Sequence, residues 1–423
     1  MADETNKDTR STSSRRKPDF SKSATTRRAG GASATATNTK NGKNHRKQAA
    51  DSSSDSKNNG TAIVDTEISG SAATSRPTTS HDKRDSMKDE VVDDGWDTDL
   101  EESSSEDLRK AGNKSDPYMA ACKSLGIVPS SYFANKYNSG STEILMRYHG
   151  IGPKGAQAIA EVLKLTNSVI IKLDLADNRL GVGAAHLGLA LQINRTLSYL
   201  DVAGNNLGTE GCRELADMLQ YNVTIKTMNV GGNHIGDKGA QLFALGLRSN
   251  SSLTALDLSR NDIGDIGVLA IGQSLSANDG LKELNISWNN IRIPGFSSFF
   301  SSIRDNVTLS HLRIHHNGIG DSVAPLALFM TKSPALQLLD LTFTRLSDAA
   351  ISSLARALET SQALKEVEFS NNPLTEQSAQ TILKALTNSN SLKKIGIKEI
   401  QMVDETRHKF ASLRSEKSVV VDM

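Results

Sequence analysis

Three histidines that lie close together, His311, His315 and His316, are the residues of this sequence that most suggest metal chemistry, because imidazole is the commonest metal ligand in proteins. If the stretch is a strand, His311 and His315 lie on one face about 13 Å apart, which is too far for one ion. His315 and His316 are neighbours in the chain, so their side chains should point to opposite faces. The sequence therefore predicts no metal site and no bound cofactor.

The short motifs that carry enzyme chemistry are missing from the sequence. It contains no GxxxxGK[ST] phosphate-binding loop, no GxSxG nucleophile motif, no HExxH zinc motif and no paired CxxC motifs. We therefore predict that the protein is not an enzyme and has no catalytic residues.

A different set of large side chains suits protein recognition. They follow one another at intervals of 27 or 28 residues, each directly before an asparagine or, in one case, a threonine. Exposed Trp, Phe and Arg are the side chains that most often anchor protein interfaces. The alternative is an aromatic packing cluster that stiffens the loops. The predicted partner-binding patch consists of Arg260, Trp288, His316 and Phe343, with Arg313 and His315 beside them.

The spacing of this patch follows from an internal repeat. Before each recurring asparagine stands a frame of leucines with alternate residues apolar, which predicts a short strand. After it, apolar residues at i, i+3, i+4 and i+7 predict one face of a helix. Thr344 takes the place of one asparagine, and His149 occupies the first place. The asparagines are Asn178, Asn205, Asn233, Asn261, Asn289, Asn317 and Asn372.

Nine strand-plus-helix units follow in tandem, and no single unit can bury its own apolar face, so they must stack into one continuous core. In the central unit, Leu253 to Leu275, we expect Asp265 to cap the N-terminus of the helix. In the seventh unit the predicted core-facing set of the helix is Ala324, Ala327, Leu328 and Thr331.

The units match the pattern LxxLxLxxNxL, and their period near 28 residues with a full helix resembles leucine-rich repeats of the ribonuclease-inhibitor type. The resemblance implies an α/β solenoid, or horseshoe, with parallel strands on the concave face and helices on the convex face. It implies that the asparagine side chains hydrogen-bond the backbone of neighbouring loops. It also implies a non-enzymatic scaffold that binds a partner protein on its concave face.

The same class includes the GTPase-activating protein of the nuclear-transport GTPase, so regulation of a small GTPase is the alternative function that the resemblance implies. Arg260, Arg313 and Arg345 could supply charge to a phosphoryl transition state. That activator carries an acidic run after its repeats, whereas the acidic run here precedes them, which disfavours this alternative.

A closer likeness precedes and opens the repeats. The segments Tyr118–Phe133 (YMAACKSLGIVPSSYF) and Tyr148–Pro153 (YHGIGP) resemble the leucine-rich repeat-containing protein seventy-four family, and the likeness extends over roughly Tyr118 to Ile400. This resemblance sharpens the expected fold and implies no activity.

The residues at the end of each predicted strand should project from the concave face, because residues between the framework leucines alternate outward. They form a mostly acidic column with one arginine. The column consists of Asp174, Asp201, Asn229, Asp257, Asn285, Arg313, Asp340 and Glu368.

Composition divides the chain into four parts: a disordered tail over 1–114, basic and then acidic, an N-terminal cap over 115–140, the nine repeats over 141–391, and a capping strand and helix over 392–423 that fray from Glu416. In the tail, Trp96, Ser103 and Ser104 are candidate partner and phosphorylation motifs.

The net charge of +1 gives no basic field for nucleic acid, and no apolar run is long enough to span a bilayer. The two cysteines suit a reducing compartment. We expect a cytoplasmic monomer, with the nucleus as a second location because of the basic clusters in the tail.

Overall fold

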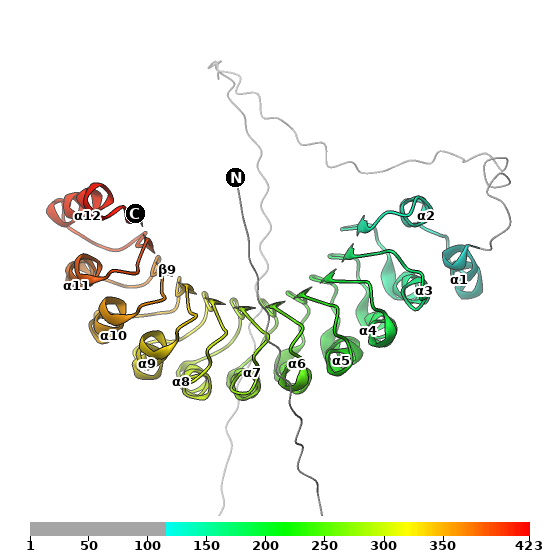
Figure 1. Ribbon diagram of the computed structural model, residues 1–423, viewed down its shortest axis with the longest axis horizontal. Helices are drawn as coiled ribbons and strands as arrows, with labels where there is room; N and C mark the ends of the chain where they lie inside the picture. The colour runs from blue at the N-terminus through cyan, green and yellow to red at the C-terminus, as the bar shows by residue number, and fades with distance from the viewer. Residues whose placement is uncertain (1–115) are drawn as a thin grey trace, which may run out of the picture. The chain divides into compact units, whose positions relative to one another are not determined.

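The computed structural model describes residues 116–423, apart from the side chain of Arg414. The predicted disordered tail, with Trp96 and its serine motifs, lies outside the described residues. In the described part, short strands alternate with helices along the whole chain (Figure 1). The strands are β1 (Glu143–Leu145), β2 (Lys172–Asp174), β3 (Tyr199–Asp201), β4 (Thr227–Asn229), β5 (Ala255–Asp257), β6 (Glu283–Asn285), β7 (His311–Arg313), β8 (Leu338–Asp340), β9 (Glu366–Glu368), β10 (Lys394–Gly396) and β11 (Val420–Asp422).

The helices cover one side of these strands. Two short 3₁₀ segments, Gly181–Gly183 and Met218–Gln220, adjoin α4 and α5. The α-helices are α1 (Pro117–Leu125), α2 (Ser131–Asn138), α3 (Gly152–Leu163), α4 (Ala184–Ile193), α5 (Gly208–Asp217), α6 (Gly236–Ser249), α7 (Asp265–Leu275), α8 (Ile293–Ser302), α9 (Ala324–Lys332), α10 (Asp348–Thr360), α11 (Glu376–Asn388) and α12 (Asp404–Lys417).

All eleven strands form one parallel sheet in chain order, from β1 to β11. Each strand pairs with the next at the same place in the repeat, so that Leu256 of β5 lies opposite Leu284 of β6. In Figure 1 the described residues form an arc with the strands on its inner side and the helices on its outer side. The predicted α/β solenoid is confirmed.

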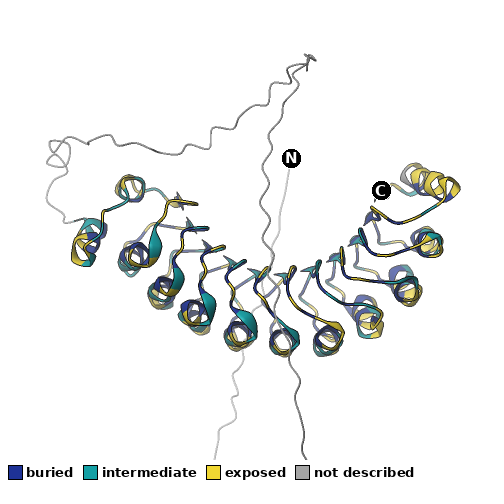
Figure 2. Ribbon diagram, turned by 180° about the vertical axis from the view of Figure 1, so that it is seen from behind, coloured by how far each residue is buried: buried dark blue, intermediate teal, exposed yellow. Residues whose placement is uncertain are grey.

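The core lies between the sheet and the helices, because the middle residue of each strand and one face of each helix turn inward (Figure 2). The helical set predicted for the seventh unit is wrong, since Ala324 and Leu328 are exposed. The buried residues are Val323, Leu326, Phe329 and Met330. In this unit Thr344, which takes the place of the next asparagine, follows Asn317 after 27 residues. The buried face of the helix begins six residues after Asn317.

The buried asparagines join neighbouring units, as the resemblance implied. The side-chain amide of Asn233 donates to the carbonyl oxygens of Val202 and Val230, and its oxygen accepts a 2.8 Å hydrogen bond from the backbone N–H of Asn205 in the preceding unit. The side-chain oxygens of Asn205 and Asn261 accept the corresponding bonds from the backbone N–H groups of Asn178 and Asn233. The column therefore satisfies buried backbone groups at each turn of the solenoid.

The asparagine column is interrupted at Thr344, whose hydroxyl donates to the carbonyl oxygen of Leu341. Threonine is too short to offer the amide oxygen that asparagine presents to the preceding unit. The backbone N–H groups of Asn317 and Ile319 consequently have no hydrogen-bond acceptor within residues 116–423. This place is a local weakness in an otherwise regular ladder.

Asp265 does not cap its own helix, so that prediction is wrong. It is the first residue of α7, and its carboxylate accepts a 2.8 Å hydrogen bond from the backbone N–H of Arg292, at the start of the next helix. Asp237 accepts in the same way from Gly264 and Gly267 at the start of α7. An acid in the first turn of one helix thus caps the following helix, because parallel stacking places successive helix N-termini side by side.

The two ends of the solenoid are covered. At the N-terminal end α1 packs against α3, with Tyr118, Cys122 and Phe133 buried. The sequence predicts a frayed end from Glu416, whereas the structure places Val420–Asp422 in the sheet as β11, paired with β10. The β-branched residues of this segment suit a strand.

None of the described helices has the length and apolar character to cross a membrane.

Candidate functional site

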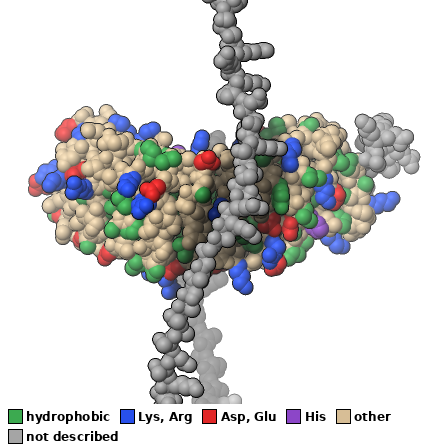
Figure 3. Space-filling view, turned by 60° about the horizontal axis from the view of Figure 1, so that its bottom comes forward, with side chains coloured by type: hydrophobic (Ala, Val, Ile, Leu, Met, Phe, Trp, Pro, Cys, Tyr) green, Lys and Arg blue, Asp and Glu red, His purple; other side chains and the backbone are tan. Residues whose placement is uncertain are grey.

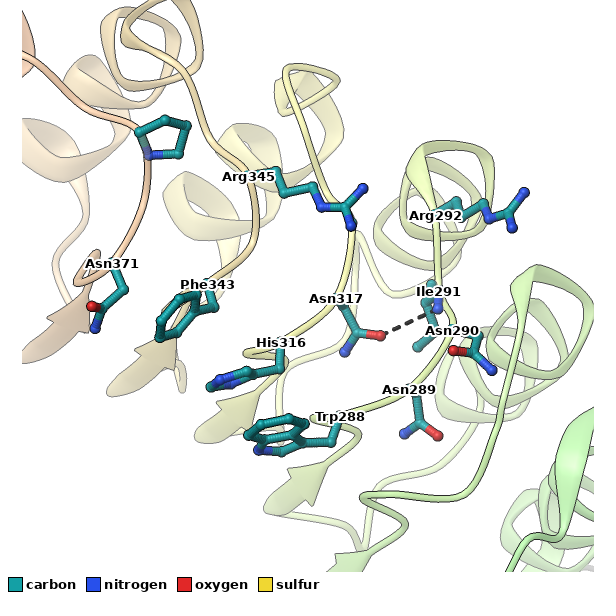
Figure 4. Close-up of a pocket in the computed structure, with 12 residues that line it drawn as sticks. Trp288, Asn289, Asn290, Ile291, Arg292, His316, Asn317, Phe343, Arg345 and Asn371 are labelled. Carbon is teal, nitrogen blue, oxygen red and sulfur yellow. Dashed lines mark hydrogen bonds between the residues drawn. The ribbon is translucent and has the colours of Figure 1, made fainter. Parts of the chain in front are cut away.

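Four of the six residues in the predicted patch stack on one another, and Figure 4 shows three of them, Trp288, His316 and Phe343. The guanidinium of Arg260 lies 4.6 Å from the ring centre of Trp288. The Trp288 and His316 rings are stacked with centroids 3.6 Å apart and planes 11° apart, and the centroids of His316 and Phe343 are 4.5 Å apart. We call Arg260, Trp288, His316 and Phe343 the aromatic ladder. It follows strands β5 to β8 on the loops that lead to the helices.

The backbone sets the spacing of the aromatic ladder. The N–H of Arg260 donates to the carbonyl oxygen of Ser287, that of Trp288 to His315 and that of His316 to Thr342, at 2.9–3.0 Å. These bonds continue the parallel pairing beyond the strands and hold each ladder residue beside the corresponding residue of the next unit. Strand spacing of about 4.8 Å then suits rings that stack face to face.

Every member of the aromatic ladder has left-handed backbone, with φ between 52° and 55°. This conformation costs an ordinary residue about 1–2 kcal/mol and suits Gly or Asn best. At the corresponding position of other units, directly before the recurring asparagine, the chain has Tyr148, Asp177, Gly204, Gly232 and Asn371. Large side chains in four consecutive units are therefore not required by the fold, and strain of this kind is concentrated at functional sites.

His315 and His316 meet rather than diverge, which corrects the prediction from strand alternation. Their Nδ1 atoms lie 2.8 Å apart, and the rings meet edge to face. The left-handed backbone at His316 breaks the alternation, since β7 has already ended at Arg313. Burial lowers the pKa of both histidines, and the adjacent His315 lowers that of His316 further. The lowered pKa values favour the uncharged form of the pair, in which one Nδ1 donates and the other accepts.

Arg313 lies beside the aromatic ladder but is not part of it. It is the last residue of β7, half-buried between Asn285 and Asp340 of the neighbouring strands. His315 contacts the aromatic ladder through His316, and its Nε2 lies 4.0 Å from the carboxylate of Asp340. The structure thus unites four of the six predicted residues, with His315 in contact with them and Arg313 at the side.

The acidic column on the concave face is largely satisfied by its own neighbours. Arg147 lies 3.8 Å from the Asp174 carboxylate and 3.5 Å from that of Asp201, and Asn229 donates to Asp201. Burial, with Asp174 nearby, raises the pKa of Asp201. Similar bonds join Asp257 to Asn285. Because these groups are already partnered, the column is a weaker candidate site than the aromatic ladder.

An open groove of about 930 Å³ runs beside the aromatic ladder. Trp288, His316 and Phe343 form one side of it, and the side chains of Arg292 and Arg345 lie on the other side of the loops (Figure 4). The remaining lining residues are uncharged. They are Asn289, Asn290, Ile291, Asn317, Gly318, Asn371 and Pro373.

Arg292 was not predicted as a site residue, although a signal exists in the sequence. Six of the nine units have glycine three residues after the recurring asparagine position, and Gly236 and Gly264 are two of these glycines. In the sixth unit, Arg292 stands three residues after Asn289. The backbone of Arg292 is extended, with φ −114°, so this position does not require glycine. The unit has a long cationic side chain there instead. Arg345, considered only as a GTPase-regulating residue, lies in the same groove.

Over residues 116–423, no group of three or more His, Cys, Asp or Glu side chains is arranged to hold a metal ion. The helical side has no large patch of one charge in the part that is visible in Figure 3, where acidic and basic side chains are interspersed with apolar ones. The aromatic ladder and its groove are therefore the strongest candidate site.

Comparison with protein families identifies the repeats. The family described as "Leucine Rich repeat" matches residues 194–216, 221–244, 249–272 and 280–299. A solved structure of the tropomodulin C-terminal domain from Caenorhabditis elegans is similar at 10% identity and a TM-score of 0.32, covering 36% of this chain and 92% of that one. These four matched segments coincide with consecutive units of the solenoid, which are leucine-rich repeats.

Proposed function

We propose that this leucine-rich repeat solenoid is a non-enzymatic scaffold that binds a partner protein through the aromatic ladder, with Arg313 and His315 beside it. Trp288 and Phe343 are 44% and 47% exposed, so almost half of each large ring is in contact with solvent. Exposed aromatic side chains held in a rigid arrangement are typical anchors of protein interfaces.

The observation that carries this proposal is the left-handed backbone beneath four consecutive large side chains. A packing role alone would be served at lower cost by glycine or asparagine, which the same column has elsewhere. Rings stacked on a hydrogen-bonded backbone also lose little conformational entropy on binding, which favours affinity.

The test is capture of partners from cell lysate by the full-length protein and by the Trp288→Gly/Phe343→Gly double variant, with quantitative mass spectrometry of the bound proteins. Glycine removes the rings and suits the left-handed backbone, so the fold should persist. We expect one or more partners to fall at least tenfold in the variant.

Tyr148→Gly is the matched control, because Tyr148 is 72% exposed with φ 62° in the same column but lies far from the aromatic ladder. It should retain the partners of the wild-type protein. The proposal fails if the double variant captures the same proteins as the wild type while both remain folded.

Regulation of a small GTPase is a special case of the same proposal, in which the captured partner is the GTPase. Arg345 in the groove is the arginine best placed for it, since Arg260 lies against Trp288. From the likeness of Tyr118–Phe133, we also propose that the chain is related to the leucine-rich repeat-containing protein seventy-four family. This relationship suggests no particular partner.

A further inference from the structure

The groove beside the aromatic ladder carries positive charge that the described protein does not neutralise. The arginine ion pairs within residues 116–423 involve Arg147, Arg213 and Arg304. Arg292 and Arg345 line the groove without a carboxylate partner in this part of the chain. A ligand seated here would therefore meet two cations in a groove whose lining residues include no acid.

The stacking within the aromatic ladder decides which face of each ring a ligand can touch. Trp288 lies between Arg260 and His316, and the 3.6 Å separation from His316 leaves no room for another planar group. A base or nucleotide ring cannot enter the ladder there without separating the rings. The ring edges remain available, and these are the positive parts of the aromatic quadrupole.

Unpaired donors extend along the same groove. Within the described residues, the indole N–H of Trp288 and the side-chain amides of Asn290 and Asn371 make no hydrogen bond. Asn290 and Asn371 come from different units, so the donors are distributed along the groove rather than gathered at one point. This arrangement suits an extended chain with several acceptors better than a single compact anion.

We infer that the ligand of this groove is an extended acidic peptide segment of the partner protein. Its carboxylates would pair with Arg292 and Arg345, its backbone carbonyl groups would accept from Asn290 and Asn371, and an apolar side chain would rest on the ring edges. The inference rests on the proposed function and adds the chemistry of the partner.

The test is selection of a phage-displayed library of random 12-residue peptides on the full-length protein, in parallel with the Arg292→Gln/Arg345→Gln variant. We expect the wild type to enrich peptides rich in Asp and Glu around at least one large apolar residue. Their affinity should fall by tenfold or more in the double variant and weaken with added salt. Arg179→Gln is the matched control, because Arg179, like Arg345, directly follows the column residue and has left-handed backbone. It should leave the affinity unchanged.

Peptides without acidic bias, equal binding by the Arg292→Gln/Arg345→Gln variant, or no enrichment at all would each overturn the inference. Preferential binding of oligo(dT) over the selected peptides, with the same dependence on Arg292 and Arg345, would also overturn it in favour of a nucleic-acid ligand. Failure here is separable from failure of the proposed function. If Trp288→Gly/Phe343→Gly loses lysate partners that Arg292→Gln/Arg345→Gln retains, the scaffold stands and the acidic ligand does not.

Discussion

Trp288 and His316 belong to successive units of the solenoid, yet their rings stack with centroids 3.6 Å apart. Both residues adopt φ 55°, and each backbone N–H donates to the unit that follows. The contact is therefore a consequence of the repeat itself, in which parallel pairing continues past the strand ends. It joins single residues of successive units into one continuous stacked surface.

The first prediction concerns the stability cost of this surface. Trp288→Gly should change the free energy of unfolding by no more than about 1 kcal/mol, because relief of the left-handed strain offsets the lost stacking. Trp288→Ala keeps the strain and should be less stable than Trp288→Gly. Urea unfolding measures both. A loss of several kcal/mol in the glycine variant would mean that Trp288 is a packing residue.

The second prediction uses the interruption of the asparagine column. Thr344→Asn should raise the free energy of unfolding by about 1–2 kcal/mol, because the new amide oxygen can accept from the backbone N–H groups of Asn317 and Ile319. The reciprocal change, Asn372→Thr, should destabilise, since Asn372 accepts from the backbone N–H groups of Thr344 and Leu346. A lower melting temperature for Thr344→Asn would mean that the asparagine column has no room for the longer side chain at this position.

A third prediction tests capping between units. Asp237→Ala should cost about 1 kcal/mol, because the carboxylate accepts from the backbone N–H groups of Gly264 and Gly267 at the start of α7. Asp279→Ala is the control, as Asp279 is exposed and no hydrogen bond or ion pair holds it within residues 116–423. Equal stability of the two variants in chemical denaturation would exclude the cap.

The fourth prediction is the pH dependence of the His315–His316 pair. Both folded-state pKa values lie below the usual value of 6.5, so between the folded pKa and 6.5 the unfolded chain binds more protons. The pair's contribution to stability is thus present above pH 6.5 and is lost as the pH falls below it. The charged groups facing the pair are Asp257, Arg260, Arg313 and Asp340.

Unfolding measured between pH 5 and 7.5 should show this loss in the wild type and less of it in His315→Gln/His316→Asn, where asparagine suits the left-handed position. An identical slope in the two proteins would assign the pH dependence to other groups.

The regular part of the fold follows from the sequence because each unit repeats the same short-range pattern. Leu256 and Leu284 occupy the same framework place and lie opposite each other in the sheet, as period and alternation require. The approximate position of the aromatic ladder is predictable for the same reason. One shift of a helical face was missed at Val323, although the 27-residue unit from Asn178 to Asn205 shows the same shift.

The missed features depend on three-dimensional relationships. Asp265 has the side chain and position of a helix cap, but stacking brings the next helix closer to its carboxylate than its own N-terminus. His315 and His316 meet because the positive φ of His316 interrupts strand alternation. Two adjacent histidines in a sequence do not predict a positive φ. Arg292 enters the site through the shape of a groove that no single unit contains.

The most direct test of the account pairs binding with stability in the same proteins. Once a partner has been identified, its affinity and the free energy of unfolding should be measured for the wild type, Trp288→Gly, Phe343→Gly and the control Tyr148→Gly. The account predicts that the two ladder variants lose at least tenfold in affinity while their unfolding free energies stay within about 1 kcal/mol of the wild type. Unchanged affinity, or a loss of affinity that only follows a loss of stability, would contradict it.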